Sequence, residues 1–456
     1  MPVKGIRAGS GGGYRLAGLR RCRPGDRDYG RKQLVNKRIP AAVAAILVLG
    51  AALGLGAGTA SAAGTAGALD GTFGHGGIVS TDVGSPSAAA LQSNGDIVIA
   101  MGTTPGSGLV RYLPNGARDT SFGQGGFAAL PDTGISSFEP RLAVQSDDKI
   151  VLAGEATSAN GSNSSFLVER LNANGTVDTG FGSGGVATTT LPVFNASVQG
   201  AQAVLIQPDG KILVGGENIT GNPSGTTRAP EDFGALARFN ANGSIDMSFG
   251  TGGQVQVGNS DFTALGLDAN GDIFTLPSRF EFSPAGHQDA TVTPAAITSA
   301  SHGGTSVFLP SGAFVTATVV TIIRRTDLDV QVQRFNADGT SASASTAFDY
   351  AGTTGSVARD IGAAVAVQAN GQVVTAGSHA ESTQTTQTSV FGLARVNADG
   401  SLDAGFGNGG VLTTRIQGND AAFVLLIQPD GKILAIGQSQ NAAGVTDLTL
   451  ARYLSQ

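Results

Sequence analysis

The sequence predicts an all-β fold, a seven-bladed β-propeller of about four antiparallel strands per blade, with the N- and C-termini meeting where the ring closes. First, the chain has 69 glycines, only 14% charged residues and no tryptophan, which is typical of a turn-rich β protein. Second, one set of motifs recurs in a fixed order, so the copies must bury one another. The phrase Phe-Gly-x-Gly-Gly begins at Phe73, Phe122, Phe181, Phe249 and Phe406.

Each copy also contains two apolar runs around a tight turn, which predicts a β-hairpin. Asn-Gly and Asp-Gly between β-rich runs are typical of type I′ turns, where both central residues have positive φ. Seven such turns set the blade count, although a linear β-solenoid is the alternative architecture. They are centred on Asn94-Gly95, Asp147-Asp148, Asp209-Gly210, Asn270-Gly271, Ser311-Gly312, Asn370-Gly371 and Asp430-Gly431.

A third motif indicates how the ring closes. A strand arginine is followed by an aspartate at a constant offset, as in Arg395 and Asp403, but the last copy, Arg452, lies too near Gln456 to have one. The missing half of that motif stands near the other end, at Leu69 to Phe73. We therefore expect Asp70 to lie beside Arg452.

These phrases resemble the bacterial delta-60 repeat family. The best copies are Phe391 to Gly410 with Gln428 to Ile433, and Gln207 to Ile212 with Phe233 to Gly253. The resemblance covers about Leu69 to Gln456 and implies a secreted or surface β-propeller, with no common activity or catalytic residues. The fourth copy has Glu281 in place of the arginine, and the fifth copy has no Phe-Gly-x-Gly-Gly before it.

The N-terminal part differs in kind. Residues 1–38 hold eleven Lys and Arg against two Asp, 39–55 are uncharged and apolar, and Ala60-Ser61-Ala62 follows. This order predicts a signal peptide with a long basic leader over 1–62, a short linker over 63–68 and the propeller over 69–456. An uncleaved membrane anchor is the alternative. We expect a secreted or cell-surface protein.

Charge and cysteine content exclude several classes of partner and site. Without the leader, the net charge changes from −6 to 17 − 32 = −15. An acidic surface disfavours nucleic acid and anionic lipid, so neither nucleic-acid binding nor membrane insertion after signal cleavage is expected. The one cysteine, Cys22, lies in the leader, so the remainder has no thiolate chemistry. We expect a monomer.

The recurring aspartates are expected to be structural, because a residue present in every copy usually holds the repeat together. The one-off candidates for acid–base catalysis are His287, Asp289 and His302, against the alternative of an exposed loop with incidental histidines. Their spacing matches no zinc signature, so no metal site and no cofactor are expected. Structural calcium at Asn397 to Asp403 is the alternative.

A long polar connection over 218–232 is the candidate binding loop, with Asn218, Asn222, Thr226, Arg228 and Asp232. The expected function is a non-enzymatic propeller that binds a protein or a cell-envelope polymer through rim loops. The alternative is an extracellular hydrolase or lyase with its site at the mouth of the central channel. A convergence of one-off carboxylates or histidines there would favour the enzyme.

Overall fold

A computed structural model describes residues 64–456, apart from 103–107, 132–139, 158–163, 192–196, 221–231, 259, 290–304, 322–327, 353–358, 383–386 and 442. Everything described belongs to the compact unit Ile39–Gln456. The predicted leader, 1–62, lies outside the described residues. Within the described part every regular element is a β-strand, and no helix there is long and apolar enough to cross a membrane.

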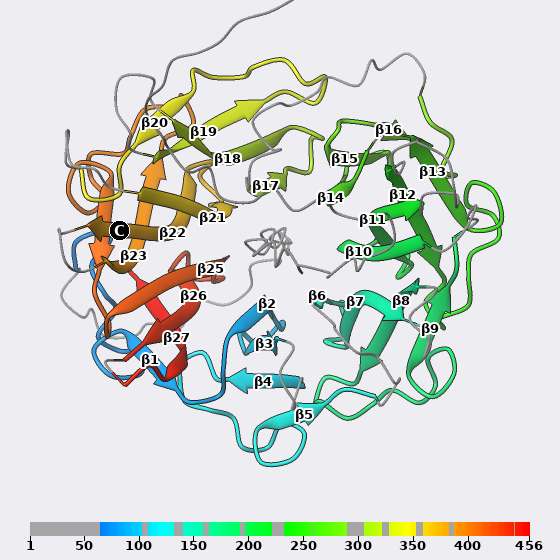
Figure 1. Cartoon of the computed structure of the whole chain (residues 1–456), viewed down its shortest axis with the longest axis horizontal. Helices are drawn as coiled ribbons and strands as arrows, with labels where there is room; N and C mark the ends of the chain where they lie inside the picture. The colour runs from blue at the N-terminus through cyan, green and yellow to red at the C-terminus, as the bar shows by residue number, and fades with distance from the viewer. Residues whose placement is uncertain are drawn as a thin grey trace, which may run out of the picture. The chain divides into compact units, whose positions relative to one another are not determined.

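Four separate antiparallel sheets come first along the chain. In Figure 1 they follow one another around a common centre, each with its first strand innermost. The strands are β2 (Pro86–Leu91), β3 (Ile97–Met101), β4 (Gly108–Tyr112) and β5 (Phe127–Ala129); β6 (Arg141–Val144), β7 (Ile150–Thr157), β8 (Ser164–Leu171) and β9 (Val186–Thr189); β10 (Ser197–Ile206), β11 (Ile212–Thr220), β12 (Asp232–Phe239) and β13 (Gln254–Gly258); and the shorter set β14 (Phe262–Leu267), β15 (Ile273–Pro277) and β16 (Glu281–Phe282).

The remaining strands form three antiparallel groups joined by single parallel contacts, Leu328 with Arg359 and Ser389 with Asn419. The all-β propeller fold is thereby confirmed, and the blade count of seven stays a prediction. The groups are β17 (Thr305–Phe308), β18 (Phe314–Thr321), β19 (Leu328–Phe335) and β20 (Thr346–Phe348); β21 (Arg359–Val367), β22 (Val373–Ser382), β23 (Gln387–Val396) and β24 (Val411–Thr414); and β25 (Asn419–Ile427), β26 (Ile433–Gln440) and β27 (Thr446–Tyr453) with β1 (Ile78–Thr81).

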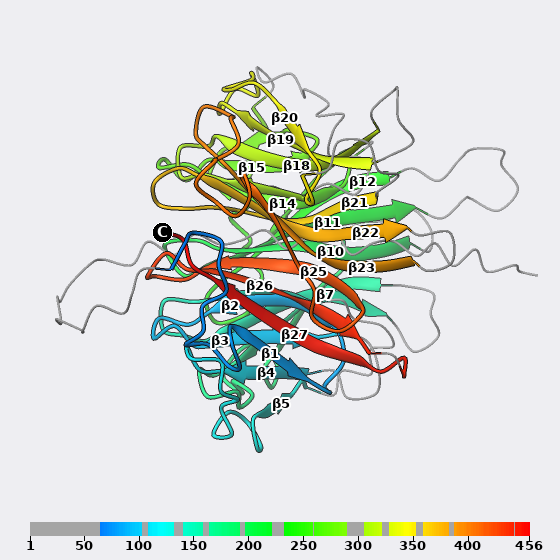
Figure 2. The same cartoon turned by 90° about the vertical axis from the view of Figure 1, so that its left-hand side faces the viewer.

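Ring closure is confirmed by β1 and β27, which pair antiparallel although they stand near opposite ends of the propeller sequence. Ile78 lies opposite Ala451 and Thr81 opposite Leu448. Figure 2 shows the two strands side by side. Asp70 lies beside Arg452 as expected, with 2.8 Å between its Oδ2 and the arginine Nη2.

The hairpin turns form with a different geometry from the predicted type I′. Gly95, Gly210 and Gly431 have φ of 85°, 82° and 83°, but the residue before each of them does not have positive φ. Each glycine N–H donates to the carbonyl three residues back, as Gly95 does to Gln92. This is the pattern of a type I turn followed by a left-handed glycine, the longer hairpin connection.

The apolar faces of neighbouring sheets pack against each other to form the core. The five phenylalanines of the Phe-Gly-x-Gly-Gly phrases are all fully buried. Each copy that carries the phrase needs this side chain for its core, which explains why the phrase recurs along the chain. The five phenylalanines are Phe73, Phe122, Phe181, Phe249 and Phe406.

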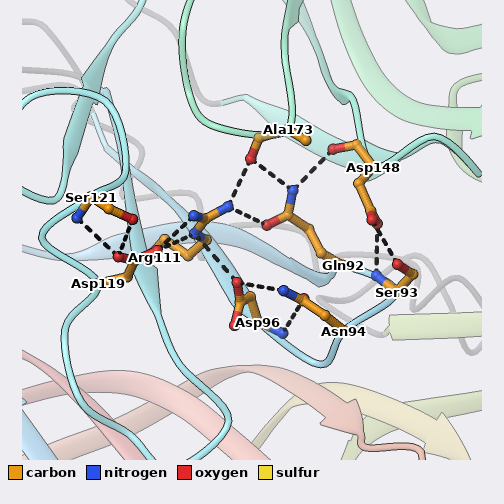
Figure 3. A network of polar contacts seen from close by, with 9 residues as sticks. All are labelled: Gln92, Ser93, Asn94, Asp96, Arg111, Asp119, Ser121, Asp148 and Ala173. Atoms are coloured by element: carbon orange, nitrogen blue, oxygen red, sulfur yellow. Dashed lines mark hydrogen bonds and ion pairs between the residues drawn. The ribbon is translucent and has the colours of Figure 1, made fainter.

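An Arg–Asp clasp ties each of five sheets to the next. The arginine of the third strand pairs with its aspartate at 2.6–2.8 Å. It lies over the buried phenylalanine ring at 4.5–4.7 Å and donates through Nη1 to a backbone carbonyl of the following sheet. Figure 3 shows the copy in which Arg111 joins Asp119, Gln92 and the Ala173 carbonyl. The clasp arginines are Arg111, Arg170, Arg238, Arg395 and Arg452.

A glycine in the second strand admits a β-bulge of the first strand. The register of β25 with β26 shifts between Ala422 and Val424, and a Cβ on Gly437 would lie 1.9 Å from the Ala421 carbonyl oxygen. We expect Gly437→Ala to lower the free energy of unfolding by about 2 kcal/mol, because the backbone must move to admit the methyl group. Urea denaturation measures this. Gly71→Ala, with nothing within 4 Å of its Cβ, is the control and should be near neutral; an equal loss in both would contradict the steric reason.

Candidate functional site

The recurring aspartates have structural partners, as expected. Asp119, Asp178, Asp246 and Asp403 each bond the arginine eight residues before them. Burial would raise the pKa of Asp246, but hydrogen bonds from Ser248 and the charge of Arg238 outweigh it and lower the pKa to about 2. Carboxylates held this firmly in the charged form are poor proton donors at neutral pH.

The residues predicted from the sequence are not gathered into one described site. His287 and Asp289 are exposed in the turn that follows β16, where the Asp289 N–H donates to the Glu281 carbonyl. His302 lies outside the described residues, so the catalytic role of this set stays a prediction.

The predicted binding loop is described only at its two ends. Asn218 lies in β11 opposite Phe233, and Asp232 in β12 lies opposite Ile219. Asn222, Thr226 and Arg228 lie outside the described residues. At the proposed calcium loop, Asp399 accepts two hydrogen bonds from Ser401 in a local turn. Both the loop's binding role and structural calcium stay predictions.

The fourth copy replaces the clasp with acidic residues. Asp268, Asp272, Glu281 and Asp289 stand where other copies have glutamine, lysine, arginine and aspartate. Burial is the main cause that raises the pKa of Asp272 and of Glu281, and the charges of the neighbouring carboxylates add to it. The buried Arg279 lies over the Phe274 ring and 3.7 Å from Glu281. The fourth copy therefore lacks the Arg–Asp clasp. Its described acidic residues do not form a recognisable reaction centre.

A different set of one-off residues does converge, between the group of β17 to β20 and the group of β21 to β24. His379 Nδ1 lies 2.7 Å from Asp360 Oδ1 and 3.4 Å from Asp349 Oδ1. One ligand atom from each of the three lies within 4.8 Å of the others. We call Asp349, Asp360 and His379 the Asp–Asp–His cluster.

Three local features bring the cluster together. Asp360 and His379 are direct partners in the β21–β22 ladder, so their side chains share one face of the sheet. Asp349 follows β20, and the next residue, Tyr350, is fully buried and donates its N–H to Asp360 Oδ2 at 2.8 Å. Thr375 lies 3.4 Å from the Tyr350 hydroxyl. The buried tyrosine therefore fixes the segment that carries Asp349.

The cluster is largely buried. β21, which carries Asp360, is the innermost strand of its group in Figure 1. The side chains of Asp360 and His379 are 0% and 4% exposed, whereas that of Asp349 is 14% exposed. Burial is the main cause that raises the pKa of Asp360; hydrogen bonds from His379 and Tyr350 oppose it, and the charge of Asp349 adds to it. Asp349 is the member of the cluster that solvent reaches most.

The next junction around the ring shows that the cluster is not part of the repeat. Asp420 occupies the position of Asp360, eight residues before the hairpin glutamine in both copies. There it accepts the Ile416 N–H, as Asp360 accepts the Tyr350 N–H. Arg415 stands in place of Asp349 and Ser439 in place of His379. Two copies therefore carry this aspartate, and Asp349 and His379 complete the cluster in only one of them.

Solved structures similar to this one include several enzymes. An α-L-arabinofuranosidase from Fusarium graminearum with an iminosugar inhibitor is 12% identical, with 83% of this chain and 98% of that chain covered and a TM-score of 0.43. The Bacillus subtilis arabinanase is 10% identical, with 69% and 92% covered and a TM-score of 0.27. A glucose dehydrogenase is 10% identical, with 82% and 99% covered and a TM-score of 0.35. No curated protein matches the chain.

These neighbours correct the expected function. The expectation of a non-enzymatic propeller that binds through its rim loops is corrected: glycoside hydrolases are among the similar structures, and two carboxylates and a histidine of this chain converge, which is the sign expected of an enzyme. At these identities the likeness concerns the fold, so the chemistry of this chain rests on its own residues.

A family model described as "Domain of unknown function (DUF5122) beta-propeller" matches residues 92–122, 145–181, 207–249, 368–406 and 428–456. Each matched stretch contains one clasp arginine, so the model follows the regular copies. The unmatched stretch between 249 and 368 contains the acidic fourth copy and both carboxylates of the cluster. Together with the sheets and their closure, the matches identify the chain as a β-propeller repeat protein.

Proposed function

We propose that this chain is an extracellular hydrolase whose reaction centre is the Asp–Asp–His cluster. The observation that carries the proposal is the convergence of Asp349, Asp360 and His379 within 4.8 Å at a position where the next junction has Arg415, Asp420 and Ser439. At that next junction a guanidinium and a hydroxyl stand in place of the second carboxylate and the imidazole, so the cluster distinguishes the first junction from the second.

The chemistry follows from what hydrolysis needs: a water made nucleophilic and a leaving group that is stabilised as it departs. The carboxylate oxygens and the imidazole nitrogen of the Asp–Asp–His cluster face one another, so they can accept a proton from water or bind a cation. Solvent reaches the cluster at Asp349, so a substrate would approach from that side. The net charge of −15 beyond the leader favours an uncharged or cationic substrate over an anionic one.

We further propose that the protein is of the delta-60 repeat type and acts outside the cell as a monomer. The long matching phrases around Gln207 to Gly253 and Phe391 to Ile433 support the repeat type. The basic, apolar and Ala-x-Ala order of residues 1–62 supports export. The acidic remainder supports a cell-envelope polymer, and not nucleic acid or lipid, as the material it meets.

The test is activity of the full chain produced in a secreting host, with uncharged glycosides, esters and envelope polysaccharides as substrates. New reducing ends without unsaturated products, or released alcohol, indicate hydrolysis, and unsaturated products would indicate a lyase and overturn the hydrolase proposal. We expect His379→Ser to lower kcat/KM by at least about a hundredfold, because it removes a group that touches the reacting water.

The matched control is Ser439→Ala, which alters the same strand position in the next sheet and should leave activity unchanged. His379→Ser places there the residue that the next sheet already carries, so we expect the variant to fold. Full activity in His379→Ser would show that the reaction centre lies elsewhere.

A further inference from the structure

We propose that the Asp–Asp–His cluster binds a divalent cation of the Zn²⁺ class. One ligand atom each from Asp349, Asp360 and His379 already lies within 4.8 Å of the others, so small side-chain movements would bring all three to one ion. Zn²⁺ sites that perform catalysis use three protein ligands and leave one position for water. The cluster supplies that number.

The electrostatics of the site favour a cation. Asp349 and Asp360 approach the same imidazole nitrogen, which places two carboxylates close together in a largely buried position. Like charges that share a site repel, and a bound cation removes that cost while it satisfies both groups. Asp360 is already oriented, because its Oδ2 accepts the Tyr350 N–H while Oδ1 faces His379.

The donor set selects the metal class. Two carboxylate oxygens and one imidazole nitrogen suit Zn²⁺ and Mn²⁺ better than Ca²⁺, which prefers six to eight oxygen ligands. Without the ion, His379 Nδ1 and Asp360 Oδ1 share a hydrogen bond at 2.7 Å. Binding would displace the proton of that bond, which would be released to solvent, because a metal binds a deprotonated imidazole nitrogen.

The junction between the groups of β21 to β24 and β25 to β27 has the same aspartate without the other two members of the cluster. Asp420 is held by the Ile416 and Gln417 N–H groups and by that of Gly418. Arg415 occupies the position of Asp349, and a guanidinium cannot bind a cation. Asp349→Arg and His379→Ser therefore convert the cluster, one residue at a time, into an arrangement that this fold already accommodates.

The catalytic meaning of the ion rests on the proposed function, but its binding can be measured without any substrate. In the hydrolase the cation would lower the pKa of a bound water and so supply the nucleophile. Binding and activity are therefore read out separately, and each can fail alone.

The experiment is calorimetric titration of the full chain, stripped with a chelator and dialysed, with Zn²⁺, Mn²⁺ or Ca²⁺ alone. We expect one Zn²⁺ per chain and a rise in the unfolding midpoint on binding, with Ca²⁺ weaker. His379→Ser and Asp349→Arg should each weaken Zn²⁺ binding by about tenfold or more, and Ser439→Ala should not. Equal Zn²⁺ affinity in the wild-type chain and in His379→Ser would overturn the proposal, as would no binding by the wild-type chain.

The two proposals fail differently. Zn²⁺ binding that His379→Ser abolishes, in a chain without hydrolase activity, supports the metal site and removes the proposed function. Hydrolase activity that is lost in His379→Ser, in a chain that binds no Zn²⁺, supports the reaction centre and overturns the metal site.

Discussion

Arg452→Met is expected to lower the free energy of unfolding by about 3 kcal/mol, because it leaves a buried carboxylate without its guanidinium partner. Arg452 Nη2 lies 2.8 Å from Asp70 Oδ2, and both side chains are only 6% exposed. The same guanidinium lies over the Phe73 ring and donates to the Pro114 carbonyl of the following sheet. One substitution therefore weakens the contact that closes the ring.

The control is Arg334→Met, the same change at the same repeat position of another sheet. The residue eight positions after Arg334 is Ala342, so the sequence provides no clasp aspartate there. Burial lowers the pKa of Arg334, so the charged guanidinium is less favourable in the folded protein than in water. We expect this variant to be neutral or slightly stabilised in urea denaturation. Equal losses in the two variants would mean that the methionine, and not the broken ion pair, causes the effect.

Acid provides a second readout of the same contact. Burial would raise the pKa of Asp70, but hydrogen bonds from Thr72 and Lys432 and the charge of Arg452 lower it to about 2. A depressed pKa stabilises the fold above the ordinary carboxyl pKa, and that stability is lost as the pH falls toward the folded-state value. The difference between wild type and Arg452→Met should therefore shrink between about pH 4 and pH 2.

The ring-closure pair was predictable because it depends on the repeat alone. Four copies place an arginine eight residues before an aspartate, so the copy split between Arg452 and Asp70 must join them for the same reason. The turn type was predicted wrongly from Asn-Gly and Asp-Gly. In these dipeptides only the glycine has positive φ, whereas a type I′ turn needs two such residues. The hydrogen bond from the Gly95 N–H to the Gln92 carbonyl closes a type I turn that ends at this glycine.

The Asp–Asp–His cluster was missed because its members are unremarkable one by one. Asp360 resembles the structural Asp420, and Asp349 follows Phe348 in a stretch that lacks the first two glycines of the Phe-Gly-x-Gly-Gly phrase. Their convergence depends on the β21–β22 register and on the burial of Tyr350, neither of which the sequence states. Aligning the copies matches Asp360 with Asp420, but Asp349 lies 11 residues before Asp360 whereas Arg415 lies five before Asp420. Only the hydrogen bonds from Tyr350 and Ile416 show that these two segments are equivalent.

Glu169→Met is expected to raise the free energy of unfolding by about 3 kcal/mol at pH 8. Glu169 is 1% exposed in β8, and its Oε2 has no hydrogen-bond partner among the described residues. Burial raises its pKa from 4.5 to about 7. At the same repeat position, before the clasp arginine, other sheets bury Val110, Ala237, Ala394 and Ala451. A carboxylate thus stands where the repeat needs an apolar side chain.

The sign of the pH dependence separates this cause from simple repacking. With a folded-state pKa of about 7 against 4.5 unfolded, the folded chain keeps the proton longer, so wild-type stability falls as the pH rises from about 4.5 to 7 and is flat above. The advantage of Glu169→Met should therefore be large at pH 8 and small at pH 4. Glu155→Met, in the neighbouring strand β7, serves as the control for adding a methionine. An advantage of the Glu169 variant that is the same at both pH values would show that packing, and not the buried charge, sets the stability at this position.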